Sequence, residues 1–175
     1  MHILDNPQAW TEFDRTGMLR QVFELPEQCQ KAWEDALKCT LPSSYRGVKN
    51  VLILGMGGSA IGGDLAAAIA RYESPCPIAV CRDYRIPSWV GSETLVVASS
   101  YSGNTEETLA AFHQALEVKA CCVAVTTGGK LGSLAKEKGI PRANPLERAF
   151  WGLRKLLLGN FEQGRPPNQW MLLIT

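Results

Sequence analysis

Two loops of small residues, several of them with hydroxyl groups, are the parts of this sequence whose composition suits chemistry. They are Gly55-Met-Gly-Gly-Ser-Ala-Ile-Gly-Gly63, the first loop, and Ser100-Tyr-Ser-Gly-Asn-Thr105, the second loop. Each follows an apolar run that is typical of a strand, and each leads into a helical pattern. The first turn of a helix has unpaired backbone N–H groups and a partial positive charge, so it binds anions. We therefore expect one loop to bind a phosphate and the other to contact the polar body that carries it.

The first loop fits more than one description. Its segment Gly55-Met-Gly-Gly-Ser-Ala60 matches a loose form of the dinucleotide-binding fingerprint, with Glu73 and Asp83 downstream as candidate ribose partners. It is not a Walker A loop, because no Gly-Lys-Ser/Thr ending follows. The glycines could also simply allow a tight turn between a strand and its helix. Ser59 favours a binding site, because its hydroxyl lies beside the amides of the two preceding glycines.

The second loop is more specific, because three hydroxyls recur within six residues. They belong to Ser100, Ser102 and Thr105. Ser102, Asn104 or Thr105 could cap the following helix, and Glu106-Glu107 would then complement the helix dipole. Capping accounts for one hydroxyl but not for three. We therefore predict an anion-binding loop.

The rest of the sequence supplies the elements that must position these loops. Apolar runs predict strands over residues 51–54, 77–81, 94–99 and 120–125. Helical periodicity predicts helices over residues 60–71, 105–117 and 130–138. This alternation predicts an α/β fold with a doubly wound parallel sheet flanked by helices. Ligands bind at the carboxyl ends of such strands, where both loops fall, and Thr126-Thr-Gly-Gly129 is either a third loop there or a plain helix entry.

Three segments are expected along the chain. Residues 1–46 are expected to form a peripheral helical segment, with a helix over residues 26–38. Residues 47–140 are expected to form the α/β domain that carries both loops. Residues 141–175 are expected to be a divergent or truncated tail, with no strand in residues 140–145 and a helix over residues 146–158.

Composition excludes several classes of function. The net charge of +1 gives no general attraction to nucleic acid, and no apolar run approaches the roughly 20 residues that cross a bilayer. No secretory signal precedes the domain, so we expect a cytoplasmic protein without a nucleic-acid or membrane partner. The six cysteines include no C-x-x-C pair, which predicts reduced thiols and no metal site. They are Cys29, Cys39, Cys76, Cys81, Cys121 and Cys122.

At these loops the sequence resembles a known family. Residues 54–65, 100–109 and 126–132 resemble the SIS (sugar isomerase) domain of the bifunctional phosphoglucose/phosphomannose isomerases, and the resemblance covers roughly residues 1–140. It implies a flavodoxin- or Rossmann-like three-layer sandwich and a homodimer. It also implies an isomerase that interconverts glucose 6-phosphate or mannose 6-phosphate with fructose 6-phosphate. The matching positions imply that this sugar phosphate is bound by Gly58, Ser59, Ser100, Ser102 and Thr105.

The resemblance also shows where this sequence departs from the family. The family's Pro-Arg segment implies a substrate-facing Arg142, although the strand and Gly-rich stretch that normally precede it are not seen here. The family's glutamate base, ring-opening histidine and lysine lie in a second SIS domain or a partner subunit. We therefore predict no catalytic residue, metal or cofactor in this chain. We expect the N-terminal half of such an isomerase, cut short near residue 140 by a deletion, frameshift or misassembly, which binds sugar phosphates with weak or no turnover.

Two alternatives remain open at this point. The chain could be a non-catalytic SIS domain that senses a sugar phosphate and associates with a DNA-binding partner. It could also be a Rossmann domain that binds NAD through the first loop.

Overall fold

A single parallel sheet organises the domain. The computed structural model describes residues 6, 10, 13–36, 41–72 and 74–143. The strands are β1 (Asn50–Leu54), β2 (Ile78–Cys81), β3 (Thr94–Ser99), β4 (Cys121–Val125) and β5 (Arg142–Ala143), in the spatial order β2-β1-β3-β4-β5. All four pairings are parallel. This is the flavodoxin-like order, so the chain changes direction across the sheet between β1 and β3.

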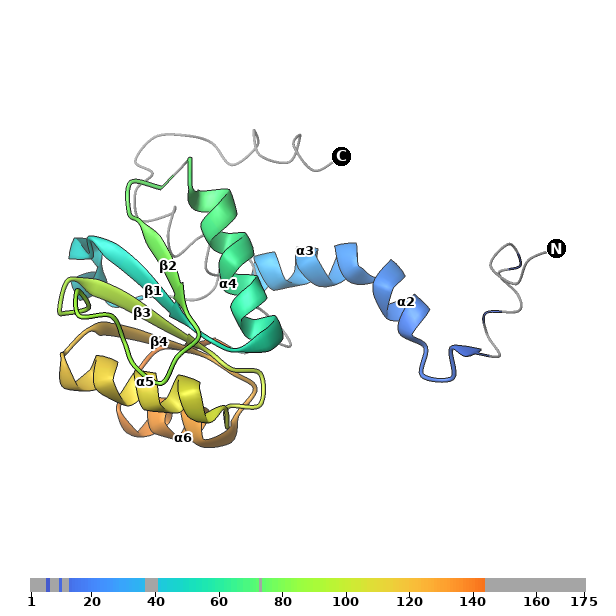
Figure 1. Ribbon diagram of the computed structural model, residues 1–175. Helices are drawn as coiled ribbons and strands as arrows, with labels where there is room; N and C mark the ends of the chain where they lie inside the picture. The colour runs from blue at the N-terminus through green and yellow to red at the C-terminus, as the bar shows by residue number, and fades with distance from the viewer. Residues whose placement is uncertain (1–5, 7–9, 11–12, 37–40, 73, 144–175) are drawn as a thin grey trace.

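Helices cover both faces of the sheet (Figure 1). They are α4 (Gly57–Ala70) on one face, and α5 (Glu106–Glu117) and α6 (Gly129–Glu137) on the other. Alternate residues of β1 and β3 therefore serve two cores. Leu52 and Val96 pack with Phe112 of α5, whereas Val51 and Ile53 pack with Ala66 of α4. Strands buried on both faces appear in the sequence as continuous apolar runs, so the doubly wound fold is confirmed.

The predicted strands and helices agree with the structure closely, with two corrections. Each of the four predicted strands is confirmed to within one residue. The helix predicted over residues 60–71 begins earlier, at Gly57, because glycines that suit a loop also allow the first helical turn to form against β1. Within α4, Gly63 is required by close packing: a Cβ on it would lie 2.9 Å from Ile53 Cγ2.

The prediction that residues 140–145 contain no strand is wrong. Arg142 and Ala143 pair with Ala124 and Val125 as the short strand β5. The bonds that hold it are Ala124 N–H to the Pro141 carbonyl and Thr126 N–H to the Ala143 carbonyl, both at 3.0 Å. A strand of two residues has no measurable periodicity of its own, so its conformation comes from pairing with β4.

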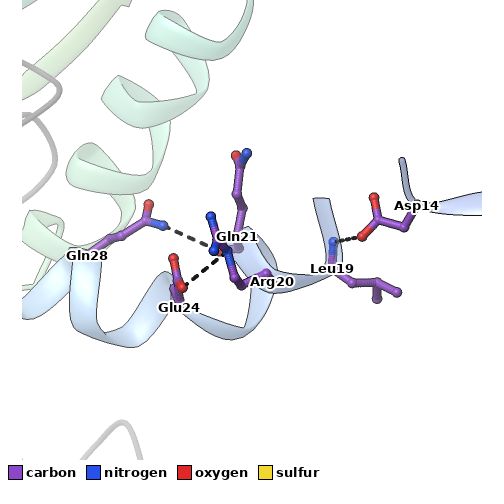
Figure 2. A network of polar contacts seen from close by, with 6 residues as sticks. All are labelled: Asp14, Leu19, Arg20, Gln21, Glu24 and Gln28. Atoms are coloured by element: carbon purple, nitrogen blue, oxygen red, sulfur yellow. Dashed lines mark hydrogen bonds and ion pairs between the residues drawn. The ribbon is translucent and has the colours of Figure 1, made fainter. Parts of the chain in front are cut away.

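The N-terminal part of the chain extends away from the sheet (Figure 1). It contains α2 (Met18–Phe23) and α3 (Leu25–Ala36). Figure 2 shows the polar contacts that stabilise α2, in which Asp14 Oδ2 accepts the Leu19 N–H at 2.8 Å and Arg20 pairs with Glu24 at 3.5 Å. The helix predicted over residues 26–38 is thus present as α3. The helix predicted over residues 146–158 lies outside the described residues.

One contact ties the connector before the sheet to the core. The 3-10 helix η2 (Ser43–Gly47) places the Tyr45 hydroxyl 2.9 Å from the carbonyl oxygen of Cys122, to which it donates a hydrogen bond. Burial of the phenol raises the pKa of Tyr45. In the part of the chain that the structure describes, every helix is too short or too polar to span a bilayer.

Candidate functional site

The first and second loops meet at the carboxyl edge of the sheet. They follow β1 and β3, which are neighbours and pair from Asn50–Thr94 to Leu54–Ala98. The loops are in contact where they begin, because a Cβ on Gly55 would lie 3.1 Å from the Ser99 carbonyl oxygen. The edge between β1 and β3 is also the topological switch point, where sheets of this kind bind ligands. Both loops are therefore positioned as the sequence predicts.

The start of the first loop is open to solvent. Gly57 and Gly58 are exposed, and a Cβ built on either would meet nothing within 4 Å. Ser59 N–H and Ala60 N–H both donate to the Met56 carbonyl, at 3.1 and 3.3 Å. Among the described residues, the amides of the two glycines have no hydrogen-bond acceptor. The first turn of α4 therefore offers two free donors beside a half-buried Ser59.

The second loop is built around a pair of hydroxyls. Ser100 Oγ and Thr105 Oγ1 share a hydrogen bond of 2.9 Å, and the Ser100 residue is only 2% exposed. Gly103 N–H donates to Ser100 Oγ at 3.1 Å. Thr105 is the N-cap residue of α5, but its side chain makes no capping hydrogen bond. Helix capping therefore does not explain the hydroxyl of Thr105.

The remaining hydroxyl of this loop is exposed. Ser102 Oγ accepts the Asn104 N–H at 3.2 Å, and Asn104 Nδ2 donates to the Ser102 carbonyl at 3.2 Å. The backbone N–H groups of Ser102, Thr105 and Glu106 find no acceptor among the described residues. The second loop thus presents unpaired donors at the N-terminus of α5, where an anion is stabilised.

The segment Thr126–Gly129, the third loop, packs against the second loop. Thr127 Oγ1 donates to the Tyr101 carbonyl at 2.7 Å, and Leu131 N–H donates to the Gly103 carbonyl at 2.9 Å. Lys130 N–H donates to Asn104 Oδ1 at 3.1 Å. The Lys130 and Leu131 amides in the first turn of α6 are therefore used internally. Sequence reasoning missed the hydrogen bonds of Asn104 and Thr127 between the second and third loops. The signal available in the sequence was that both of these loops contain glycines, which allow two backbones to approach closely.

Arg142 lies apart from the two loops. It is exposed on β5, and β4 separates its strand from β3. Its Nη1 atom would lie 3.2 Å from a Cβ on Gly132, in α6. The described residues include no hydrogen bond or ion pair between Arg142 and either loop. Its role as a substrate-facing arginine stays a prediction.

The segment after β2 bridges the helices of the two faces. Arg82 forms an ion pair with Asp64 of α4, and Gln114 Nε2 of α5 donates to the Tyr84 carbonyl at 2.6 Å. The negative charge of Glu107, more than burial, raises the pKa of Tyr84. This segment therefore borders the carboxyl edge of the sheet, beside the first turn of α5.

A cavity of about 600 Å³ lies elsewhere, along the outer edge of β2 and the end of α4. Its lining includes Asp64, Arg71, Cys76 and Arg82. None of the predicted site residues contributes to it. Among the described residues, no group of three or more His, Cys, Asp or Glu side chains is placed to hold a metal ion.

Comparisons with known proteins place the sequence beside sugar-phosphate enzymes. No family model matches it. It is 46% identical over 122 residues to a bifunctional phosphoglucose/phosphomannose isomerase of Caldicellulosiruptor bescii, covering 70% of this chain and 36% of that protein. It is 45% identical over 85 residues to the enzyme of that name in Thermoplasma acidophilum, covering 49% of this chain and 26% of that protein. The chain thus spans about a third or less of the length of these relatives.

A solved structure supports the fold. The C-terminal domain of a glucosamine-fructose-6-phosphate aminotransferase from Francisella tularensis has a TM-score of 0.53 and 18% identity, covering 77% of this chain and 40% of that chain. Identity this low supports the fold alone. The resemblance that the loop motifs predict is confirmed by the relatives, and the doubly wound α/β fold by the structure.

Proposed function

We propose that this chain, a partial relative of the bifunctional phosphoglucose/phosphomannose isomerases, binds a sugar phosphate at the switch point between β1 and β3. The second loop would take the phosphate through Ser100, Ser102 and Thr105. Gly58 and Ser59 would contact the sugar. The observation that carries the proposal is the hydrogen-bonded pair of Ser100 and Thr105 hydroxyls beside unpaired amides at the start of α5.

The proposed reaction of the whole enzyme is the interconversion of glucose 6-phosphate or mannose 6-phosphate with fructose 6-phosphate. It would proceed by ring opening and proton transfer between C1 and C2 through a cis-enediol. A general base must lie within hydrogen-bond reach of those carbons. Glu106 and Glu107 lie in the first turn of α5, where they complement the helix dipole, and Glu107 faces Tyr84. We therefore assign sugar-phosphate binding to the residues of the first and second loops. We assign no catalytic residue to this chain.

Ligand titration followed by thermal unfolding tests the proposal. Fructose 6-phosphate should raise the melting temperature, whereas fructose and NAD should not. A ligand at a hundred times its Kd stabilises the folded state by about 2.7 kcal/mol, which is readily measured. Stabilisation by NAD instead of the sugar phosphate would favour the Rossmann alternative. An isomerase assay of the purified chain should detect weak or no turnover, and ordinary enzymatic rates would contradict the assignment of binding alone.

A sensor of sugar phosphates is the second candidate, because the described site supplies binding groups without an assigned base. In that case, fructose 6-phosphate should promote association with a DNA-binding partner. Pull-down from an extract with and without the ligand, followed by identification of the bound protein, separates this candidate from the isomerase.

We further propose that the protein is a cytoplasmic homodimer. The family resemblance supports the dimer. Free thiols support a reducing compartment, and Cys76, Cys81, Cys121 and Cys122 are free in the described residues. Sedimentation velocity tests the dimer.

Arg142 is kept as a proposed sugar-phosphate contact, and an Arg142→Ala variant with unchanged affinity would remove it. The divisions at residues 46 and 140 are proposed domain limits, which limited proteolysis tests.

A further inference from the structure

We propose that Thr127 and Asn104 are positioning residues, which hold the carbonyl groups of the second loop away from the bound phosphate. This inference rests on the proposed function and adds two residues that do not touch the ligand. It concerns the side of the second loop against which the third loop packs.

Every carbonyl from Ser100 to Gly103 already accepts a hydrogen bond. The Ser100 carbonyl accepts Gly103 N–H at 3.1 Å. The Tyr101 carbonyl accepts two donors of Thr127, Oγ1 at 2.7 Å and N–H at 3.2 Å. The Ser102 carbonyl accepts Asn104 Nδ2 at 3.2 Å. The Gly103 carbonyl accepts Leu131 N–H at 2.9 Å.

Several amides in and just after the same loop show the opposite pattern. Those of Tyr101, Ser102, Thr105 and Glu106 have no acceptor within the described part of the chain. A peptide group points its N–H and C=O in opposite directions. The Tyr101 carbonyl shares its peptide group with the Ser102 N–H, so fixing this carbonyl on Thr127 keeps the Ser102 donor available. A carbonyl oxygen turned toward a phosphate would instead repel it, because both carry negative charge.

Close backbone packing also fixes the second loop against the third loop. Gly103 has φ +68°, and a Cβ on it would collide with the Gly128 carbonyl group. A Cβ on Gly129 would collide with the Ser102 carbonyl oxygen. The two loops therefore touch along their main chains, which holds the Tyr101 carbonyl beside Thr127. Thr127 is the one side chain of the third loop that donates to a carbonyl of the second loop among the described residues.

The test compares Thr127→Val, Thr127→Ser and Ser133→Ala. Valine keeps the shape of threonine and the backbone N–H bond but loses the hydroxyl donor, and serine keeps both donors. Ser133 supplies a matched control, because its hydroxyl donates to Gly129 within α6 at 3.1 Å and does not bind the second loop. Binding of glucose 6-phosphate and of inorganic phosphate is measured by calorimetry. We expect Thr127→Val to weaken both about tenfold, and the other two variants to bind within about twofold of the wild type.

Amide NMR supplies a readout that a general loss of stability would not move. Phosphate should shift the Ser102 and Thr105 amide resonances in the wild type and in Thr127→Ser, and much less in Thr127→Val at equal melting temperature. Should Thr127→Val unfold, Asn104→Ala takes its place, since Asn104 is exposed and its loss frees the Ser102 carbonyl.

The outcomes separate the two proposals. A wild type that binds neither glucose 6-phosphate nor phosphate overturns the proposed function and this inference together. A wild type that binds, with Thr127→Val and Asn104→Ala binding equally well, overturns the inference and leaves the proposed function intact. Weakening that Thr127→Ser fails to restore, or that Ser133→Ala reproduces, also overturns the positioning role.

Discussion

At the scale of single residues, the site depends on hydroxyls and glycines whose uses differ from place to place. Ser100 and Thr105 are close in sequence, and the loop folds their hydroxyls into one part-buried pair. Ser102 remains exposed and bonds only within the loop. The three hydroxyls that look equivalent in the sequence are therefore not equivalent in the structure, and substitutions should distinguish them.

Thr105→Val tests the hydroxyl pair. It keeps the shape of the side chain and removes the oxygen that bonds to Ser100 Oγ. We expect glucose 6-phosphate affinity to fall at least about tenfold, and the free energy of unfolding to fall by about 1 kcal/mol, as for one intramolecular hydrogen bond. Calorimetry and urea unfolding measure these effects. Unchanged affinity would place the phosphate elsewhere.

Gly58→Ala and Gly103→Ala should separate binding from folding. A methyl group on Gly58 enters open space, and removing a glycine from a helix stabilises it by about 0.5–1 kcal/mol. We expect the Gly58→Ala protein to unfold at higher urea and to bind the sugar phosphate more weakly, because the methyl group occupies the ligand's side of the first turn. Equal affinity in this variant would show that the sugar does not approach Gly58.

Gly103→Ala is the matched comparison. Its φ of +68° and its contact with the Gly128 carbonyl leave no space for a methyl group. Strain of this kind and the required movement of the third loop should lower the free energy of unfolding by more than about 2 kcal/mol. Urea unfolding measures the loss, and a stable Gly103→Ala protein would mean that the two loops are less tightly packed than described.

At the scale of elements, β1, β3 and α5 hold the site in place. β1 and β3 are buried in the centre of the sheet, and α5 packs on them through Phe112, which is fully buried. α5 begins at the second loop, so its packing also fixes the direction of the unpaired amides. The helices around the sheet thus support the loops that precede them.

Phe112→Ala tests this support. Removing a fully buried phenylalanine costs about 3–5 kcal/mol, because the lost contacts leave a cavity. The exposed neighbour His113 serves as the control, and His113→Ala should change the free energy of unfolding by less than about 0.5 kcal/mol. Urea unfolding compares the two variants. Equal stability would contradict the described core.

At the scale of the whole molecule, packing on both faces of the parallel sheet excludes water from polar side chains on its central strands. Cys122 on β4 is 2% exposed, and burial, assisted by the nearby Cys121, raises the pKa of its thiol to about 12. The native thiol stays protonated and unreactive where an exposed thiol would ionise.

The pH dependence of stability follows from this shift. The pKa of Cys122 is higher in the folded state than the ordinary thiol value of 9.0. The unfolded chain therefore releases this proton at a lower pH than the folded protein does. The contribution of this thiol to the free energy of unfolding is fully present below pH 9 and is lost as pH rises toward about 12. We expect urea unfolding between pH 8 and 10.5 to show a steeper loss in the wild type than in Cys122→Ala. Parallel curves would contradict the buried thiol.

The sequence by itself determined the doubly wound α/β domain and the placement of both loops at one edge of the sheet. Continuous apolar runs such as residues 51–54 report burial on both faces, and chain order places the loops at the carboxyl ends of the strands. The family resemblance implies that the second loop takes the phosphate, which remains a prediction.

Tertiary structure alone decided which groups of those loops are free. The pairing of Ser100 with Thr105, the use of Thr127 to hold the Tyr101 carbonyl, the strand at Arg142 and its distance from the switch point all depend on contacts between distant segments. A local pattern reports what a residue can donate or accept. Only the packing of one loop against another determines which donors are already used, because each backbone group points in a direction that long-range pairing sets.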